Sequence, residues 1–235
     1  MAPLSYQVDD GVASITMDDG KVNVLSPEML AELRAALDRA AGDALPVVLR
    51  GRDGIFSAGF DLKVLTGAGS AAADLLKAGF TLTERLLSFP APTVVACTGH
   101  AIAMGLFTLL SGDYRIGVSG PYRLTANEVA IGMTLPRSAT EVCRYRLAPG
   151  SFDRAVVLAE VFSPESAVTA GILDQVVAAE ELDATLDAVV GRLRSLDPGA
   201  HRATKLRARE ELLATLRAAI EADDADFRRA FASRI

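Results

Sequence analysis

The chain has 235 residues, of which 50% are hydrophobic and 23% are charged. This composition excludes a disordered chain and allows a sizeable core, in one large domain or in a domain with an appendage. The formal net charge of −6 argues against a non-specific nucleic-acid-binding protein.

The N-terminal part predicts a layered α/β structure. Residues 6–8 and 11–17 are predicted to form a β-hairpin, with an Asp-Asp-Gly turn between them. Ser26 is a favourable helix N-cap, and apolar residues then recur at helical spacing to about Ala41. Residues 45–49 predict a buried strand. The order strand, strand, helix, strand is typical of layered α/β proteins.

A loop at residues 56–61, with the sequence Phe-Ser-Ala-Gly-Phe-Asp, follows this strand. A single helical turn is predicted at residues 62–65, with Asp61 near its start. Small residues allow a ligand or a second backbone to come close. Backbone N–H groups near a helix start have no acceptor in the helix, so they can face an anion or a polarised carbonyl.

The middle of the chain predicts further strands and helices. A helix at residues 71–89 is ended by a Pro-Ala-Pro sequence. We then predict a buried strand (93–98), a turn of small residues (99–105), a buried helix (106–111) and two strands (114–118 and 122–125). Asn127 and Glu128 are predicted to lie at the end of the last strand, before the apolar residues 129–133.

The last third is predicted to be mostly helical. The expected helices cover about 136–146, 151–160, 164–170, 180–195, 199–209 and 210–231, with one short strand at 173–177. The composition shifts toward Ala, Leu, Arg and Glu near residue 178, which is typical of helices that dock on another surface. We therefore place a boundary near 165–178 and divide the chain into residues 1–170 and 171–235.

Cysteine and histidine usage indicates the expected compartment. Cys97 and Cys143 are the two cysteines, and their apolar or helical surroundings favour buried thiols over a disulfide. His100 and His201 do not form a metal-ligand pattern. The longest apolar run, residues 101–110, is too short to cross a bilayer, and the N-terminus does not resemble a signal peptide. We expect a soluble cytoplasmic protein with no metal, membrane or nucleic-acid partner.

A plan of strand, small residues and helix occurs twice, at residues 45–65 and 93–111. Two such turns side by side could aim two backbone N–H groups at one oxygen and form an oxyanion hole. The sequence supplies these donors but not their convergence. On the residues alone, two tight turns with purely structural roles are the simpler interpretation.

Glu128 is the candidate acid or base, because it precedes the apolar residues 129–131. Desolvation raises the pKa of a carboxyl group in apolar surroundings, which suits a general base that acts on a carbon acid. The alternative is a loop glutamate that faces water.

Together these segments resemble the crotonase superfamily, the enoyl-CoA hydratase/isomerase superfamily. Residues 56–62 resemble its first signature, Phe-[Ser/Ala]-Ala-Gly-x-Asp-[Leu/Ile], and residues 99–116 resemble a second segment that ends in Asp-Tyr-Arg-Ile. Residues 127–132 resemble the third, in which Pro-Glu or Asn-Glu precedes an apolar run and a glycine. Residues 21–26 resemble the Asn-Ala-Leu stretch before the first helix. The likeness covers nearly the whole chain.

The resemblance implies an α/β fold with a spiral of ββα units in residues 1–170. Residues 171–235 would be a C-terminal helical region that makes a homotrimer or a dimer of trimers. The backbone N–H groups of Phe60 and Met104 would form an oxyanion hole for a thioester oxygen. The implied acyl-CoA site has these members: Ala58, Phe60, Asp61, Leu62, Lys63 and Lys21, with the two lysines near the CoA phosphates. No cofactor is implied, because coenzyme A is part of the substrate.

One departure from the family pattern bears on the reaction. Hydratases of the family carry a second glutamate at the position of Phe107, and phenylalanine cannot transfer a proton. Hydration needs two proton-transferring groups, whereas a double-bond shift needs one. Glu128 would take a proton from C2 of a 3-enoyl-CoA and return it at C4, while the oxyanion hole holds the dienolate. The resemblance therefore points to an enoyl-CoA isomerase.

Two further departures keep alternatives open. Met104 stands where the family usually has glycine, and Ala103 replaces another common glycine. These changes alter the geometry expected for the oxyanion hole. A hydratase in which another residue replaces the lost glutamate is one alternative. A non-catalytic acyl-CoA-binding protein is the other, and Met104 and Phe107 favour it.

Overall fold

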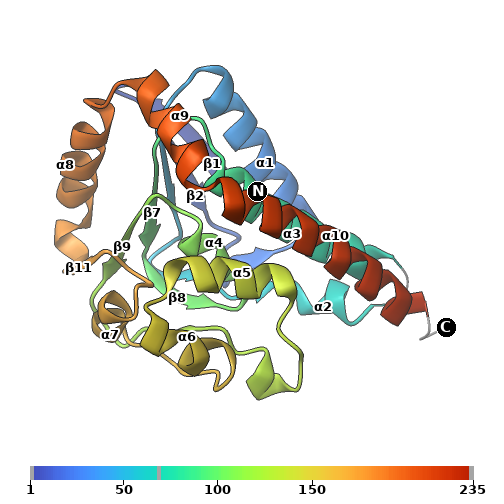
Figure 1. Cartoon of the computed structure of the whole chain (residues 1–235). Coiled ribbons are helices and arrows are strands. Elements are labelled where there is room, and N and C mark those ends of the chain that lie inside the picture. The colour runs from blue at the N-terminus through green and yellow to red at the C-terminus, as the bar shows by residue number, and fades with distance from the viewer. Residues whose placement is uncertain (1–2, 68–69, 233–235) are drawn as a thin grey trace.

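The computed structural model describes residues 3–67 and 70–232 (Figure 1). Its main sheet has six strands, in the spatial order β1 (Leu4–Asp9), β2 (Val12–Met17), β4 (Val47–Arg50), β7 (Thr93–Cys97), β9 (Tyr114–Val118) and β11 (Gln175–Val177). The antiparallel pair β1 and β2 is the predicted hairpin, and every later pair in this sheet is parallel.

Shorter strands follow the main ones and form two small sheets. One contains β10 (Leu124–Thr125), β8 (Gly99–Ile102) and β5 (Gly54–Ser57), and the other contains β3 (Val24–Leu25) and β6 (Gly59–Phe60). The helices of the first two-thirds are α1 (Pro27–Gly42), α2 (Leu62–Leu65), α3 (Ala71–Leu87), α4 (Met104–Leu110), the 3₁₀ turn η1 (Val129–Ile131), α5 (Arg137–Arg146), α6 (Pro149–Val156) and α7 (Pro164–Thr169). Long strand, short strand and helix recur along the chain, which confirms the predicted α/β spiral.

The prediction of a turn at residues 99–105 is wrong for its first half, because Gly99–Ile102 form strand β8 between β5 and β10. Gly99 is small because the two strands nearly touch there. A Cβ atom on Gly99 would lie 2.0 Å from the carbonyl carbon of Gly54. The small residues therefore allow close strand packing rather than a chain reversal.

Three other predicted boundaries also differ from the structure. The predicted strand at 122–125 is reduced to Leu124–Thr125. The loop predicted at 56–61 is extended in part, as the ends of β5 and all of β6. The helix predicted at 151–160 ends at Val156, and Ala159 has a positive φ of 50°, which α-helical backbone cannot accommodate.

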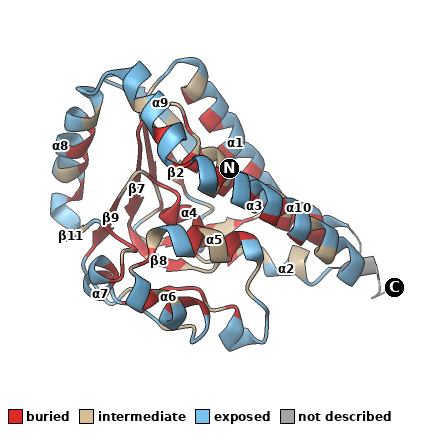
Figure 2. Cartoon of the chain, viewed as in Figure 1, coloured by how far each residue is buried: buried red, intermediate tan, exposed pale blue. Residues whose placement is uncertain are grey.

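Both faces of the main sheet are covered. On one face, α8 (Leu182–Arg194) lies alongside the sheet, with buried residues on the side that faces it (Figures 1 and 2). It packs on side chains from three central strands, β4, β7 and β9. The members of this cluster from the sheet are Val48, Val94, Ala96, Ile116 and Val118. The opposite face contributes Val47, Leu49 and Val95 to the larger core. Burial on both faces explains why these strands are continuously apolar rather than alternating.

Residues 171–235, which we predicted to be a helical region for oligomerisation, also contribute β11 to the main sheet. Their helices are η2 (Ala179–Glu181), α8, α9 (Pro198–Ala208) and α10 (Glu210–Ala232). Figure 1 shows α10 lying along α3 and α5. Its buried Asp223 accepts hydrogen bonds from the N–H and hydroxyl groups of Ser138, at 2.9 and 2.8 Å, and so caps the start of α5. A role in oligomerisation stays a prediction.

A buried ionic cluster joins α9 to the sheet. The Asp113 carboxylate lies 2.7 Å from Lys205 Nζ and 2.8 Å from Arg209 Nη1, and it accepts a hydrogen bond from the Thr93 N–H at 2.8 Å. Burial is the largest single effect on the pKa of Asp113 and raises it, but the attraction to Lys205 and Arg209 and the hydrogen bonds from Lys205 and Thr93 together lower it below its ordinary value. Nearby, Arg146 donates to the carbonyls of Leu110 and Gly112, at the C-terminal end of α4.

Candidate active site

The loop that precedes β6 is fixed by a buried hydrogen-bond network. Asn23 is fully buried, and its side-chain amide donates to the carbonyls of Met17 (3.0 Å) and Phe56 (3.2 Å). The Ser57 hydroxyl donates to the Asn23 carbonyl at 2.7 Å and accepts from the Gly59 N–H at 3.1 Å. These bonds determine the path of the chain into Phe60. The sequence did not lead us to predict that Asn23 and Ser57 shape the site. Their only signal was that each lies inside a segment that resembles a motif of the family.

The two strand–turn–helix segments meet at Gly59. Its φ is +90°, and a Cβ atom there would lie 3.1 Å from Ala103 Cβ and 3.3 Å from Met104 N. Glycine is required at this position for both its conformation and this approach. The two segments are therefore in contact at residues that directly precede or adjoin Phe60 and Met104.

The directions of the Phe60 and Met104 amides follow from the elements that contain them. Along an extended strand, successive N–H groups point to opposite edges. The Asp61 N–H faces Leu25 O of β3 at 3.4 Å, so the Phe60 N–H points to the other edge. Met104 begins α4, and the first amide of a helix has no acceptor inside the helix.

Ala103 carries backbone strain immediately before α4. Its φ of 51° and ψ of −123° lie in a region that favours glycine. Its N–H donates to the carbonyl of Thr125 at 2.9 Å, which holds the strained residue in place.

We expect Ala103→Gly to stabilise the fold by about 1 kcal/mol, because relief of the strain outweighs the extra freedom of glycine in the unfolded chain. Urea unfolding of the variant and the parent measures this difference. Ala126→Gly, at a buried residue without a positive φ, is the control and should destabilise. If both variants were destabilised equally, the backbone of Ala103 would not be strained.

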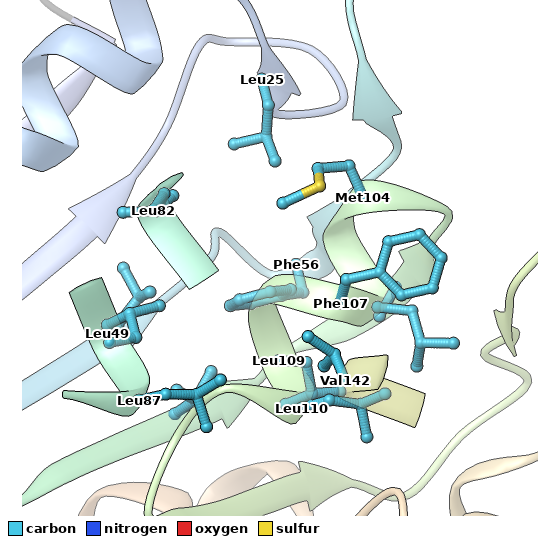
Figure 3. Packing of buried hydrophobic residues seen from close by; sticks show 14 of the residues in the cluster. Leu25, Leu49, Phe56, Leu82, Leu87, Met104, Phe107, Leu109, Leu110 and Val142 are labelled. Carbon is cyan, nitrogen blue, oxygen red and sulfur yellow. The ribbon is translucent and has the colours of Figure 1, made fainter. Parts of the chain in front are cut away.

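Met104 and Phe107 project from α4 into the core (Figure 3). Met104 is fully buried and points toward Leu25 and Leu82. Phe107 is 1% exposed, and its ring stacks on Phe80 of α3 with centroids 6.2 Å apart. The position of Phe107 is thus filled by an aromatic column and has no proton-transferring group.

Glu128 is buried, and one of its carboxyl oxygens has no hydrogen-bond partner within the described residues. The residue is 7% exposed and immediately precedes η1. Neither its Oε2 nor the Oδ1 of Asn127 has a hydrogen-bond partner within the described residues, although both atoms are buried. Burial raises the pKa of Glu128 from 4.5 to about 7. The alternative of a loop glutamate facing water is wrong.

A hydrogen bond links the segment before Glu128 to the residue before Met104. Thr125, three residues before Glu128, holds Ala103 through its carbonyl. Cys143 of α5 lies close enough for the Glu128 charge to raise the pKa of its thiol, after the larger effect of burial. The carboxyl group therefore belongs to the same local structure as Met104.

The remaining predicted site residues lie near the surface. Asp61 caps α2 by accepting from the Lys63 N–H at 2.9 Å, and Leu62 is 62% exposed. Ala58 donates its N–H to Val22 O at 3.0 Å, which brings the loop of Lys21 alongside it. Lys21 and Lys63 are both exposed.

Arg52 is a residue that sequence reasoning missed. Its Nη1 donates to the carbonyl of Lys21 at 2.8 Å, so a second cation lies beside that lysine. Its signal in the sequence was its place just before the 56–61 loop. Arg52 also lies 3.8 Å from the Asp18 carboxylate and attracts Asp19, so this edge carries charges of both signs.

Within residues 3–67 and 70–232, no group of three or more His, Cys, Asp or Glu side chains is placed to hold a metal ion. None of the helices in the described part is long and apolar enough to cross a membrane. Cys97 and Cys143 are buried free thiols, as predicted.

Known proteins that are similar to the chain point to one family. The family model described as "Enoyl-CoA hydratase/isomerase" matches residues 7–234. A crystal structure of an enoyl-CoA hydratase/isomerase family protein from Pseudomonas syringae is 49% identical, has a TM-score of 0.93, and the match covers 95% of this chain and 97% of that one.

Differently named relatives are similar to the chain. The structure of an enoyl-CoA isomerase from Mycobacterium tuberculosis is 44% identical with a TM-score of 0.91, over 95% of this chain and 98% of that one. A probable enoyl-CoA hydratase of the same species is 35% identical over 192 residues, which cover 77% of this chain and 74% of the relative. Because relatives with both names are similar to the chain, these similarities do not distinguish an isomerase from a hydratase.

Proposed function

Because the chain belongs to the enoyl-CoA hydratase/isomerase family, we propose that it is an isomerase that shifts the double bond of a 3-enoyl-CoA to position 2. The observation that carries the proposal is the contrast between Glu128 and Phe107. Glu128 is a buried carboxyl group with an unsatisfied oxygen, whereas Phe107 fills the position of the second hydratase glutamate with a packed ring. One acid–base group is sufficient for a double-bond shift and insufficient for efficient hydration.

In the proposed mechanism, the Glu128 carboxylate takes a proton from C2 of the substrate. The electrons of that C–H bond move into the thioester, and the resulting dienolate oxygen accepts hydrogen bonds from the N–H groups of Phe60 and Met104. Protonated Glu128 then returns the proton at C4, which leaves the double bond between C2 and C3. Ala58, Asp61, Leu62 and Lys63 line the acyl-CoA path, with Lys21 and Arg52 near the CoA phosphates. No cofactor or metal takes part in these steps.

The apolar surroundings of Glu128 support this role. A carboxyl group with a pKa near 7 can both accept and donate a proton at neutral pH. The neighbouring Val129 and Ile131 are 46% and 55% exposed, and they offer apolar surface beside the carboxyl group for an acyl chain.

The test offers purified protein a 3-enoyl-CoA and a 2-enoyl-CoA, and follows conversion together with binding. Formation of 2-enoyl-CoA from the first substrate, with little hydration of the second, supports the isomerase. Rapid hydration of 2-enoyl-CoA would refute it. Tight binding of both thioesters without turnover would indicate an acyl-CoA-binding protein.

The pH dependence of the reaction follows from Glu128. The residue must start as a carboxylate, so kcat/KM should fall about tenfold per pH unit below pH 7 and level off above it. A profile of kcat/KM from about pH 5 to about pH 9 measures this. An inflection near the ordinary carboxyl value of 4.5 would show that Glu128 does not supply the base.

We also propose that the chain assembles as a homotrimer or as a dimer of trimers and works in the cytoplasm. Light scattering of the purified protein determines the number of subunits. This assembly is a separate proposal from the isomerase chemistry.

A further inference from the structure

Gly79 lies in the middle of α3, where glycine makes a helix less stable than alanine would. The packing around it explains its presence. A Cβ atom on Gly79 would lie 2.4 Å from both Cε1 and Cζ of Phe60, and 3.5 Å from Cε of Met104. The side chains of Phe60 and Met104, whose backbone amides adjoin the contact at Gly59, therefore meet again at one glycine of a neighbouring helix.

The Phe60 ring is held against this glycine. It packs edge-to-face on Phe80, with centroids 6.2 Å apart and an interplanar angle of 73°. Phe80 in turn stacks on Phe107 of α4. The ring thus connects β6, α3 and α4, the three elements that surround the two amides.

Met104 completes the contact from the other side. Its side chain is fully buried, and its terminal methyl group is at ordinary contact distance from the space above Gly79. A methyl group at position 79 would therefore overlap the Phe60 ring but not Met104.

We propose that Gly79 is the positioning residue that sets the spacing between the Phe60 and Met104 amides. This inference rests on the proposed function in one respect, because those amides are assigned there to the thioester oxygen. An alanine methyl group at position 79 would require the Phe60 ring to move by about 1 Å to reach an ordinary contact distance. The ring is packed on Phe80 and is not free to turn aside, so the displacement passes to the backbone of Phe60 in the two-residue strand β6 and moves its amide.

The first experiment compares Gly79→Ala, Phe60→Leu and the double variant in the isomerase assay. Gly79→Ala should lower kcat by about 10- to 100-fold, with a smaller change in KM, because a displacement of this size removes the alignment of the donors. The double variant should have the kcat of Phe60→Leu alone, because the smaller side chain removes the overlap. Two results would overturn the proposal. One is a double variant whose loss of kcat equals the product of the losses in the two single variants, and the other is a Gly79→Ala variant with unchanged kcat.

The second experiment needs no substrate. Met104 is the only methionine that follows an alanine, so labelling alanine carbonyls with ¹³C and methionine amides with ¹⁵N isolates its amide signal in NMR spectra. Gly79→Ala should shift this signal, and Phe60→Leu in the same chain should restore it toward that of Phe60→Leu alone. An unmoved signal in Gly79→Ala would overturn the proposal even if activity falls.

Gly191→Ala is the matched control. Gly191 also lies inside a helix, α8, but a Cβ atom there would meet no atom within 4 Å. This variant should keep its kcat and its Met104 signal. A wild-type protein that isomerises no enoyl-CoA, but whose Met104 signal moves as expected, would refute the proposed function and leave the spacing role of Gly79 in place.

Discussion

Glu128→Gln is expected to remove isomerase activity and, at the same time, to make the folded chain more stable at pH 8. The activity should fall by about 10²- to 10⁴-fold, because glutamine cannot take a proton from C2 and no acid stands at Phe107 to replace it. KM should change less than kcat, because glutamine has nearly the same size as glutamate.

The gain in stability follows from the raised pKa. In the unfolded chain the Glu128 carboxyl group ionises near its ordinary value of 4.5, whereas in the fold burial holds its pKa at about 7. Between these values the folded chain binds more protons than the unfolded chain, so the free energy of unfolding falls as pH rises. Above pH 7 this cost is constant at up to about 3 kcal/mol, and glutamine removes it.

Urea unfolding at about pH 4 and about pH 8 measures this difference. The variant should be more stable than the parent at the higher pH and nearly equal to it at the lower pH. Glu32→Gln, at an exposed residue of α1, should change neither stability nor activity. A Glu128→Gln variant that retains substantial isomerase activity would contradict the assignment of the base.

Asp113→Asn should have the largest effect on stability, a loss of about 3–5 kcal/mol. The substitution leaves the ammonium group of Lys205 and the guanidinium group of Arg209 buried without their shared carboxylate. Burial already lowers the pKa of Lys205 to about 8 despite the attraction of Asp113, so this ammonium group depends on its partner to remain charged.

Two controls separate this effect from the loss of any ion pair. Asp10→Asn removes a pair of similar length, the 2.8 Å contact with Arg194, but Asp10 is 87% exposed and the change should cost less than about 1 kcal/mol. Adding Lys205→Met to Asp113→Asn should recover part of the loss, because one uncompensated charge is removed. Equal costs for Asp10→Asn and Asp113→Asn in urea unfolding would contradict the importance of burial.

The sequence predicted local structure well where apolar periodicity and turn chemistry agree. The β1–β2 hairpin, the Ser26-capped α1 and the buried β7 all follow from such patterns. Strand β8 was missed because its small residues read as a turn. The reason for their size, the contact of Gly99 with Gly54, is a distance between segments 45 residues apart in the chain and has no local signal.

In the candidate site, too, local motifs were predicted and contacts between distant segments were not. Motif resemblance identified Phe60, Met104, Phe107 and Glu128, but residue types alone could not show that the first two meet at Gly59 or that Glu128 is buried. The arginine-rich last third was predicted to contain docking helices. Two cations of this region, Lys205 and Arg209, enclose Asp113. This contact depends on how α9 packs against the sheet, and no short sequence pattern indicates that packing.

The strand order of the main sheet has a consequence for synthesis on the ribosome. Spatial order repeats chain order from β1 to β11, so each strand that emerges finds its neighbour already present at the growing edge. Helix α10 follows all of these strands in the chain, yet it packs on α3 and α5, which were made long before it. The nascent chain therefore carries a nearly complete sheet while the faces of α3 and α5 under α10 remain uncovered. Such apolar surface on a nascent chain is what chaperones bind, so we expect dependence on them to end when α10 docks.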